Sequence, residues 1–120
     1  MRTIYKTKNT TLNAAMREYL GSKVVGVVEK LIGDDEAAML EIEFALVTRH
    51  HRKGDVWRAE ANLILGKKMI RAEETGDDPH AVIDALGDEL SREIKSFKDK
   101  SKTKNIRGGR TIKKILKKPL

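Results

Sequence analysis

The stretches MLEIEFALV at residues 39–47 and WRAEANLIL at residues 57–65 indicate the fold class of this 120-residue chain. In both stretches apolar side chains alternate with polar or charged ones, and a period of two is typical of a strand with one buried face. A polar connection at 50–55 separates them, and a third short run follows at 69–74. Three successive strands with short connections predict an antiparallel meander whose second face is solvated.

A helix is predicted directly after this meander. Asp77 and Asp78 precede Pro79. An aspartate N-cap accepts hydrogen bonds from the first free main-chain N–H groups, and proline at the first helical position loses no bond. Apolar residues then recur at the spacing of one helical face, namely Ile83, Leu86, Leu90, Ile94 and Phe97. Because this face ends there, the helix is expected to end near Asp99.

A second helix is predicted before the meander. Asn13 is its expected N-cap. The apolar residues that follow at spacings of four, four, three and four are Met16, Leu20, Val24, Val27 and Leu31. Gly21 and Gly26 weaken this helix by about 1 kcal/mol each relative to alanine. A short strand at 3–8 precedes it, so the predicted order is β-α-β-β-β-α.

This order predicts an α+β fold in two layers, with one mainly antiparallel, four-stranded sheet and two helices on the same face of it. The folded domain is expected to span residues 1–99. Residues 100–120 are expected to form a basic, flexible tail, without structure of its own over 100–109. A turn of helix at 111–116 is expected only on a partner.

Positive charge is concentrated at the C-terminal end. Residues 95–120 hold eleven Lys or Arg and a single acid, Asp99, whereas residues 1–94 hold 14 bases and 17 acids. The dipole of a helix end explains two or three of these lysines, but not the continuation of the run. Because such a run repels itself until an anion neutralises it, the pattern favours a polyanionic partner and an affinity that falls steeply with salt.

Other classes of function find little support in the sequence. Cysteine is absent, and His50, His51 and His80 lack the spacing of metal ligands. Without a catalytic or nucleotide-binding motif, no enzyme activity, cofactor, metal or small-molecule substrate is expected. The tail has few large apolar side chains, which argues against a membrane partner. The absence of a signal peptide and of a membrane-length apolar run favours a cytoplasmic location.

Aromatic residues make up 4% of the chain, which is too few for reading single-stranded bases by stacking. Phe44 and Trp57 fall on the predicted core face, which leaves Tyr5 and Tyr19 as spare stacking surfaces. The expected mode of recognition is therefore the shape and phosphates of structured RNA.

Several segments together resemble a known family. They are IRAEE at 70–74, DD at 77–78, AVID at 81–84, LSR at 90–92 with Ile94 and, nearer the N-terminus, KN at 8–9, MREY at 16–19 and Lys23. This combination is similar to the signature of the ribosome hibernation promoting factor and ribosome-associated inhibitor A family, also called sigma-54 modulation proteins. The resemblance covers roughly residues 2–100 and is that of a short family member.

The resemblance implies a β-α-β-β-β-α fold similar to double-stranded-RNA-binding domains. It also implies binding to the small ribosomal subunit, in the channel of tRNA and mRNA, and inhibition of translation in starved or stationary cells. The partners would be the subunit and its rRNA, and the protein is expected to be monomeric off the ribosome. With two lysines added from the C-terminal charge run, the expected RNA-binding residues are Arg17, Lys23, Arg71, Arg92, Lys95, Lys98, Lys100 and Lys102.

The sequence departs from the family pattern at two positions, and two alternative functions also fit its charge pattern. Glu89 occupies a position where the family usually has lysine, and His80 one where it often has an aromatic residue. The charge pattern also fits a general structured-RNA-binding module without preference for ribosomes. A third hypothesis is a structural or interaction protein whose tail meets an acidic protein partner.

Overall fold

The computed structural model describes the backbone of residues 1–48 and 54–109, and the side chains of residues 1–47 and 54–100. The elements within these ranges follow the predicted order. They are β1 (Arg2–Lys8), α1 (Ala14–Leu20), η1 (Gly21–Val25), α2 (Gly26–Ile32), β2 (Met39–Thr48), β3 (Asp55–Leu65), β4 (Lys68–Gly76) and α3 (Pro79–Gly109). Most of the predicted connection at 50–55 and the predicted helical turn at 111–116 lie outside the described residues.

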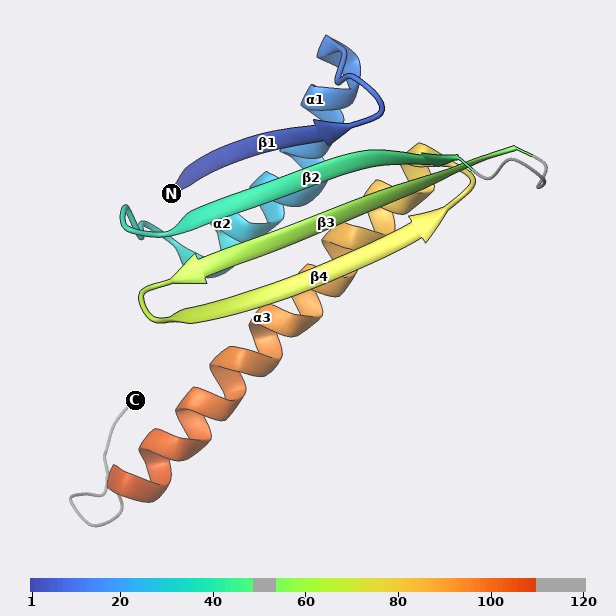
Figure 1. Ribbon diagram of the computed structural model, residues 1–120. Coiled ribbons are helices and arrows are strands. Elements are labelled where there is room, and N and C mark those ends of the chain that lie inside the picture. Colours follow the sequence, from blue (N-terminus) through green and yellow to red (C-terminus); the bar gives the residue numbers. More distant parts are fainter. Residues whose placement is uncertain (49–53, 110–120) are drawn as a thin grey trace.

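The four strands form one sheet in the order β1-β2-β3-β4 (Figure 1). β1 and β2 are parallel, because the helical stretch between them returns the chain to the end of the sheet where β1 begins. The other two pairs are antiparallel, with Ile42 opposite Ala61 and Ala61 opposite Ala72. The mainly antiparallel sheet that the sequence predicts is confirmed.

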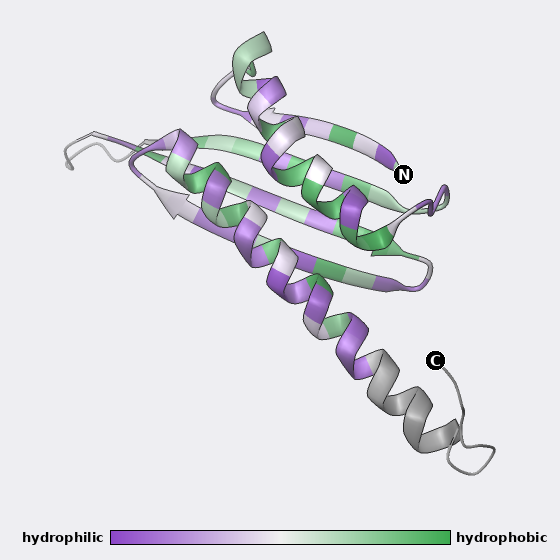
Figure 2. Cartoon of the chain, turned by 180° about the vertical axis from the view of Figure 1, so that it is seen from behind, coloured by the Kyte–Doolittle hydropathy of each residue, from purple (hydrophilic) through white to green (hydrophobic). Residues whose placement is uncertain are grey.

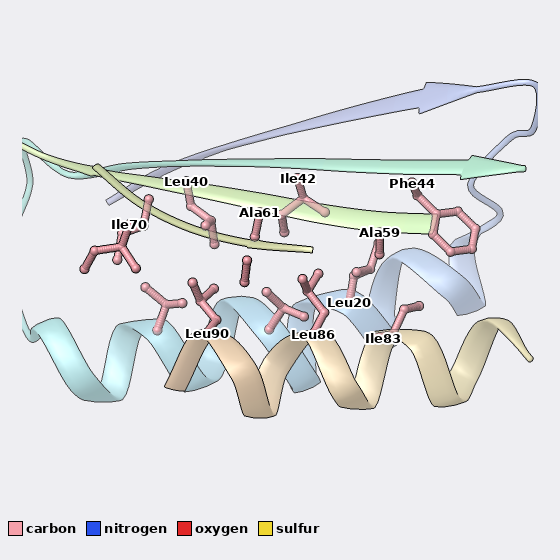
Figure 3. Packing of buried hydrophobic residues seen from close by; sticks show 14 of the residues in the cluster. Leu20, Leu40, Ile42, Phe44, Ala59, Ala61, Ile70, Ile83, Leu86 and Leu90 are labelled. Carbon is pink, nitrogen blue, oxygen red and sulfur yellow. The ribbon is translucent and has the colours of Figure 1, made fainter. Parts of the chain in front are cut away.

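The helices cover one face of this sheet, and the core lies between the two layers (Figures 1 and 3). Ile83, Leu86 and Leu90 of α3 point toward the sheet, where they meet Leu40 and Ile42. All five side chains are fully buried, and burial of each contributes about 1.5–3 kcal/mol. The predicted two-layer α+β fold is therefore confirmed.

Both predicted N-caps form in the structure. The side chain of Asn13 accepts a hydrogen bond of 2.7 Å from the N–H of Met16 at the start of α1. Asp78 accepts one of 3.0 Å from the N–H of His80 at the start of α3. These bonds satisfy main-chain donors that a helix leaves free at its first turn, and they fix where each helix begins.

The helical stretch from α1 to α2 contains a π-helical turn, η1, in which Gly26 donates its N–H to the carbonyl of Gly21. The sequence predicts Val24 and Val27 on the buried face. The structure buries Val24 and Val28 fully, whereas Val27 is only half-buried. The reason is the wider turn, which holds more residues than an α turn and moves the buried face by one position.

Helix α3 is longer than its apolar pattern predicts. Residues 100–109 were expected to lack structure of their own, but the helical backbone continues to Gly109 and projects past the sheet (Figure 1). Extending an existing helix avoids the cost of nucleation, and neither proline nor glycine occurs between residues 88 and 107. The division into a domain at 1–99 and a flexible tail at 100–120 stays a prediction.

Candidate nucleic-acid interface

Five of the predicted RNA-binding residues lie in the helical layer, which faces the viewer in Figure 2. They are Arg17 in α1, Lys23 in η1, and Arg92, Lys95 and Lys98 in α3. Each of these residues is exposed. The two-layer fold thus gathers cations from three helical elements on one side of the molecule.

Two of these cations lie over tyrosine rings. The Arg17 guanidinium is 4.4 Å from the centre of the Tyr5 ring, and the Lys23 ammonium is 5.8 Å from that of Tyr19. Such contacts contribute about 0.5–1 kcal/mol at exposed sites and restrict the long cationic side chains. Tyr5 and Tyr19 were expected to be spare stacking surfaces, but both are partly buried and contact cations of their own chain.

A hydrogen bond joins α1 to α3 beside Lys23. Tyr19 Oη donates to Asp84 Oδ1 over 2.6 Å, and His80 packs edge-on against the Tyr19 ring at 4.9 Å between ring centres. The hydrogen bond to Asp84, with a smaller effect of desolvation, raises the pKa of the Tyr19 phenol, so the phenol stays protonated and continues to donate. Asp84 is therefore partnered and not a free anion on this surface.

The main chains of α3 and η1 meet at Gly87. A Cβ atom at this position would overlap the carbonyl oxygen of Lys23, so only glycine allows this approach. The contact sets the distance between Lys23 and the cations of α3. Neither the charge pattern nor the apolar pattern of the sequence predicts this close approach. A glycine inside an otherwise strong helix is the signal that could have found it.

Lys98 has a structural contact in addition to its charge. Its Nζ donates to the carbonyl oxygen of Leu31 over 2.8 Å. The last carbonyl groups of a helix have no partner within the helix, and a lysine near the C-terminus commonly satisfies one. Lys98 therefore ties α3 to the end of α2, a role that the sequence did not predict.

The sign of the charge changes along α3. Residues 84–89 carry three acids, whereas Arg92 and Lys95 begin the cationic part of the helix. These two residues are three positions apart and exposed, so their side chains lie on one side of the helix. Lys100 is exposed farther along, and the side chain of Lys102 lies outside the described residues.

Arg71 lies on the other face of the sheet, away from the helices. Ile70 and Ala72 of β4 enter the core, so Arg71 between them points outward. There it forms an ion pair with Glu60. The structure does not bring Arg71 together with the five cations of the helical layer.

A network of ion pairs occupies this helix-free face, with Arg58 at its centre. The Arg58 guanidinium lies 3.1 Å from Glu43 and 3.3 Å from both Glu60 and Glu73. The four residues come from three adjacent strands, and the planar fork of arginine suits several carboxylates at once. The helix-free face of β2 to β4 is therefore held by internal ion pairs, whereas the cations of the helical layer are exposed.

Glu89 faces another carboxylate, that of Glu74. A hydrogen bond with Glu74, partial burial and the charge of Glu74 together raise the pKa of Glu89, while Arg92 opposes the change. Because the pKa of Glu89 is raised in the folded state, the bond between protonated Glu89 and Glu74 stabilises the fold fully below the ordinary carboxyl pKa. This contribution to stability is lost as the pH rises through the raised pKa. Above that value the charge of Glu74 disfavours the ionised form of Glu89.

Glu89→Gln is therefore expected to stabilise the protein at pH 7, by about 0.5 kcal/mol for a pair of partly exposed carboxyl groups. The gain should shrink as the pH falls through the raised pKa of Glu89, because the protonated Glu89 side chain no longer carries the unfavourable charge. Thermal unfolding followed by circular dichroism measures both values. Glu93→Gln, which removes the same charge from an exposed site on the same helix, should leave the melting temperature nearly unchanged. Equal gains for the two variants would contradict the pairing.

The described residues contain neither a candidate metal site nor a candidate membrane-spanning helix. Among them, no three His, Cys, Asp or Glu side chains are grouped so that they could hold a metal ion. Within the same ranges, no helix is long and apolar enough to cross a bilayer. An open hollow of about 450 Å³ is lined by Met1, Glu29, Gly33, Asp34 and Glu36, which offer carboxylates but neither a nucleophile nor histidine.

The fold has counterparts among solved structures. The N-terminal domain of Thermus thermophilus Protein Y matches with a TM-score of 0.65 and 22% identity, over 81% of this chain and 99% of that one. A ribosomal subunit interface protein from Coxiella burnetii matches with a TM-score of 0.63 and 19% identity, over 82% of this chain and 99% of that one. These likenesses show the fold alone, and the similarity to double-stranded-RNA-binding domains stays a prediction.

Comparison of the sequence with known families identifies the family of this chain. Residues 3–102 match the model of the Sigma 54 modulation protein / S30EA ribosomal protein family, so the chain belongs to this family, and the predicted resemblance is confirmed. The ribosome hibernation promotion factor of Staphylococcus aureus (strain COL) is 27% identical over 97 residues, which make up 81% of this chain and 48% of that protein. The chain thus spans about half the length of this curated relative.

Proposed function

We propose that this protein is a non-enzymatic factor that associates with the ribosome and binds rRNA of the small subunit through its helical layer. The family match covers residues 3–102, which hold nearly all of the sheet and most of the helical layer. One similar protein is named a ribosome hibernation promotion factor and another a ribosomal subunit interface protein. The finer proposal is that the protein lies in the channel of tRNA and mRNA, in the cytoplasm of starved or stationary cells, and inhibits translation there.

The observation that carries this proposal is the set of contacts that joins the helical elements beneath these cations. The Tyr19–Asp84 hydrogen bond joins α1 to α3, and Lys98 joins α3 to the end of α2. Between these two links, Gly87 lets the helices touch. Cations that are already positioned lose less conformational freedom on binding, so this layer suits a fixed array of phosphates.

The contacts favour recognition of phosphate and shape over recognition of bases. Tyr5 and Tyr19 already contact Arg17 and Lys23, which leaves little aromatic surface for unstacked bases. Lys100 and Lys102, on or near the projecting part of α3, would extend the contact along the same polyanion. Each phosphate contact adds about 0.7–0.9 to the slope of log affinity against log salt concentration.

Co-sedimentation with purified small ribosomal subunits in sucrose gradients tests this function. The protein is expected to travel with the subunits at low salt and to dissociate as salt rises. Excess free RNA duplex serves as a competitor. If the protein binds the free duplex as tightly as it binds ribosomes, it is a general structured-RNA-binding module. Binding that survives nuclease treatment would instead indicate an acidic protein partner.

A further inference from the structure

The N-terminal end of the chain carries a second cationic surface. Residues 1–17 contain four Lys or Arg and neither Asp nor Glu. Three of these bases gather at one end of β1 and the start of the helical layer: Lys6, Lys8 and Arg17. All three are exposed. The proposed function uses Arg17 but gives no part to the two lysines.

The register of the sheet places the two lysines on its helix-free face. Lys6 is level with Glu43 and Lys8 with Ala45 in the parallel pair. These two positions of β2 alternate with the helix-facing residues Ile42 and Phe44, so they lie on the opposite face. Glu43 does not compensate Lys6 fully, because its carboxylate already bonds to Arg58 at 3.1 Å. Two residues along a strand span about 6.6 Å, a spacing close to that of successive phosphates in one nucleic-acid strand.

Arg17 flanks the same edge strand from the other side. It lies over Tyr5 of β1, on the helix-facing side of the sheet. The loop between β1 and α1 is fixed by Asn9, which has a φ of 59° and donates its side-chain amide to the carbonyl of Leu46. The edge of β1 is thus bordered by lysines on one face and an arginine on the other.

The main chain of β1 adds further groups at this edge. The N–H of Arg2 donates to Ala38 at the start of β2, so by alternation the main-chain groups of Tyr5 and Thr7 face the open edge. Their N–H groups can donate to phosphate oxygens, and the neighbouring carbonyl groups can accept from a ribose 2′-hydroxyl. An edge that offers cations, main-chain donors and main-chain acceptors suits an RNA backbone better than a polyanion without hydroxyl groups.

This edge is well separated from the cationic part of α3. The outer strands β1 and β4 are about 14 Å apart across three strand spacings. Lys8 also lies at the end of the sheet where α3 begins, whereas the cations of α3 lie toward its far end (Figure 1). One straight phosphate strand along α3 would miss β1, so a folded RNA that presents two stretches of backbone is needed to reach both.

We propose that the β1 edge, with Lys6, Lys8 and Arg17, is a second RNA-backbone site, and that the protein uses it together with α3 to bridge two backbone segments of one folded RNA. This inference rests on the proposed function for the identity of the RNA, but not for the site itself. Lys6 and Lys8 are residues that neither the charge run nor the family resemblance singled out as RNA-binding.

The test compares two double variants of the full chain that change the net charge equally. Lys6→Gln with Lys8→Gln removes the proposed contacts. Met69→Glu with Thr75→Glu adds two negative charges on the same sheet face at the opposite edge, where both residues are exposed. Binding to purified small subunits and to a free RNA duplex is measured at several salt concentrations, after circular dichroism has shown that both variants fold.

The lysine variant is expected to bind subunits about 10-fold more weakly at low salt, with a salt slope smaller by about 2, or about 1 for each lost phosphate contact. The control variant should keep the wild-type slope. Equal losses in both variants, or no loss in either, would overturn the second site. If the wild type fails to bind subunits but binds duplex, the proposed function is wrong, and the slopes measured on duplex still decide about the β1 edge.

Discussion

Replacing Arg92 and Lys95 together with glutamate is expected to lower the affinity for small ribosomal subunits by about 100-fold or more at moderate salt. The change removes two phosphate contacts and introduces two repulsive charges at the same place. Both side chains are exposed on α3 and outside the core, so the fold should persist. Lys98 is left unchanged, because its bond to Leu31 belongs to the fold. Filter binding or co-sedimentation over a salt series measures the effect.

The reciprocal exchange, Arg92→Lys with Lys95→Arg, is the matched control. It keeps both charges and the helix, and phosphate recognition depends mainly on charge, so affinity within about 3-fold of the wild type is expected. If the glutamate variant binds as well as this control, α3 is not part of the interface. If both variants bind poorly, the geometry of individual side chains matters more than their charge.

Gly87→Ala is expected to destabilise the protein by about 2 kcal/mol. The new methyl group would overlap the main-chain carbonyl of Lys23, and a main chain cannot rotate away as a side chain can. Overpacking costs about 1–3 kcal/mol or more, which outweighs the gain of about 1 kcal/mol in helix propensity. The melting temperature should fall by about 8 °C or more, as thermal unfolding would show.

Gly21→Ala is the control for this prediction. Gly21 lies in the neighbouring helical stretch, and its Cβ would meet nothing within 4 Å. The same substitution there should leave stability unchanged or raise it by up to about 1 kcal/mol. A Gly87→Ala variant as stable as the wild type would show that α3 and η1 do not touch at this position.

Much of the fold could be predicted from local patterns. The alternation in β2 and β3, the caps Asn13 and Asp78 and the apolar stripe of α3 each act within a few residues, so they are visible in one sequence. The prediction failed at η1, because hydrogen bonds five residues apart leave no simple mark on apolar spacing. It also failed at the end of α3, because a helix that has already formed can extend beyond its apolar face.

For the candidate interface, the charge pattern of the sequence identifies the cations but not where the fold places them. Arg17, Lys23, Arg92, Lys95 and Lys98 do lie on one layer, as a shared function would require. Arg71 does not, since strand alternation and the position of the helices place it on the opposite face, beside Glu60.

The order of the elements, the buried faces of β2, β3 and α3, and the excess of positive charge at the C-terminal end follow from the sequence, because they depend on neighbours along the chain. Only the tertiary structure shows which residues meet between neighbouring helices: Tyr19 with Asp84, Lys98 with Leu31, and Gly87 with Lys23. Such contacts join residues more than sixty positions apart. Their existence depends on how two helices lie side by side on a sheet, which no local spacing records.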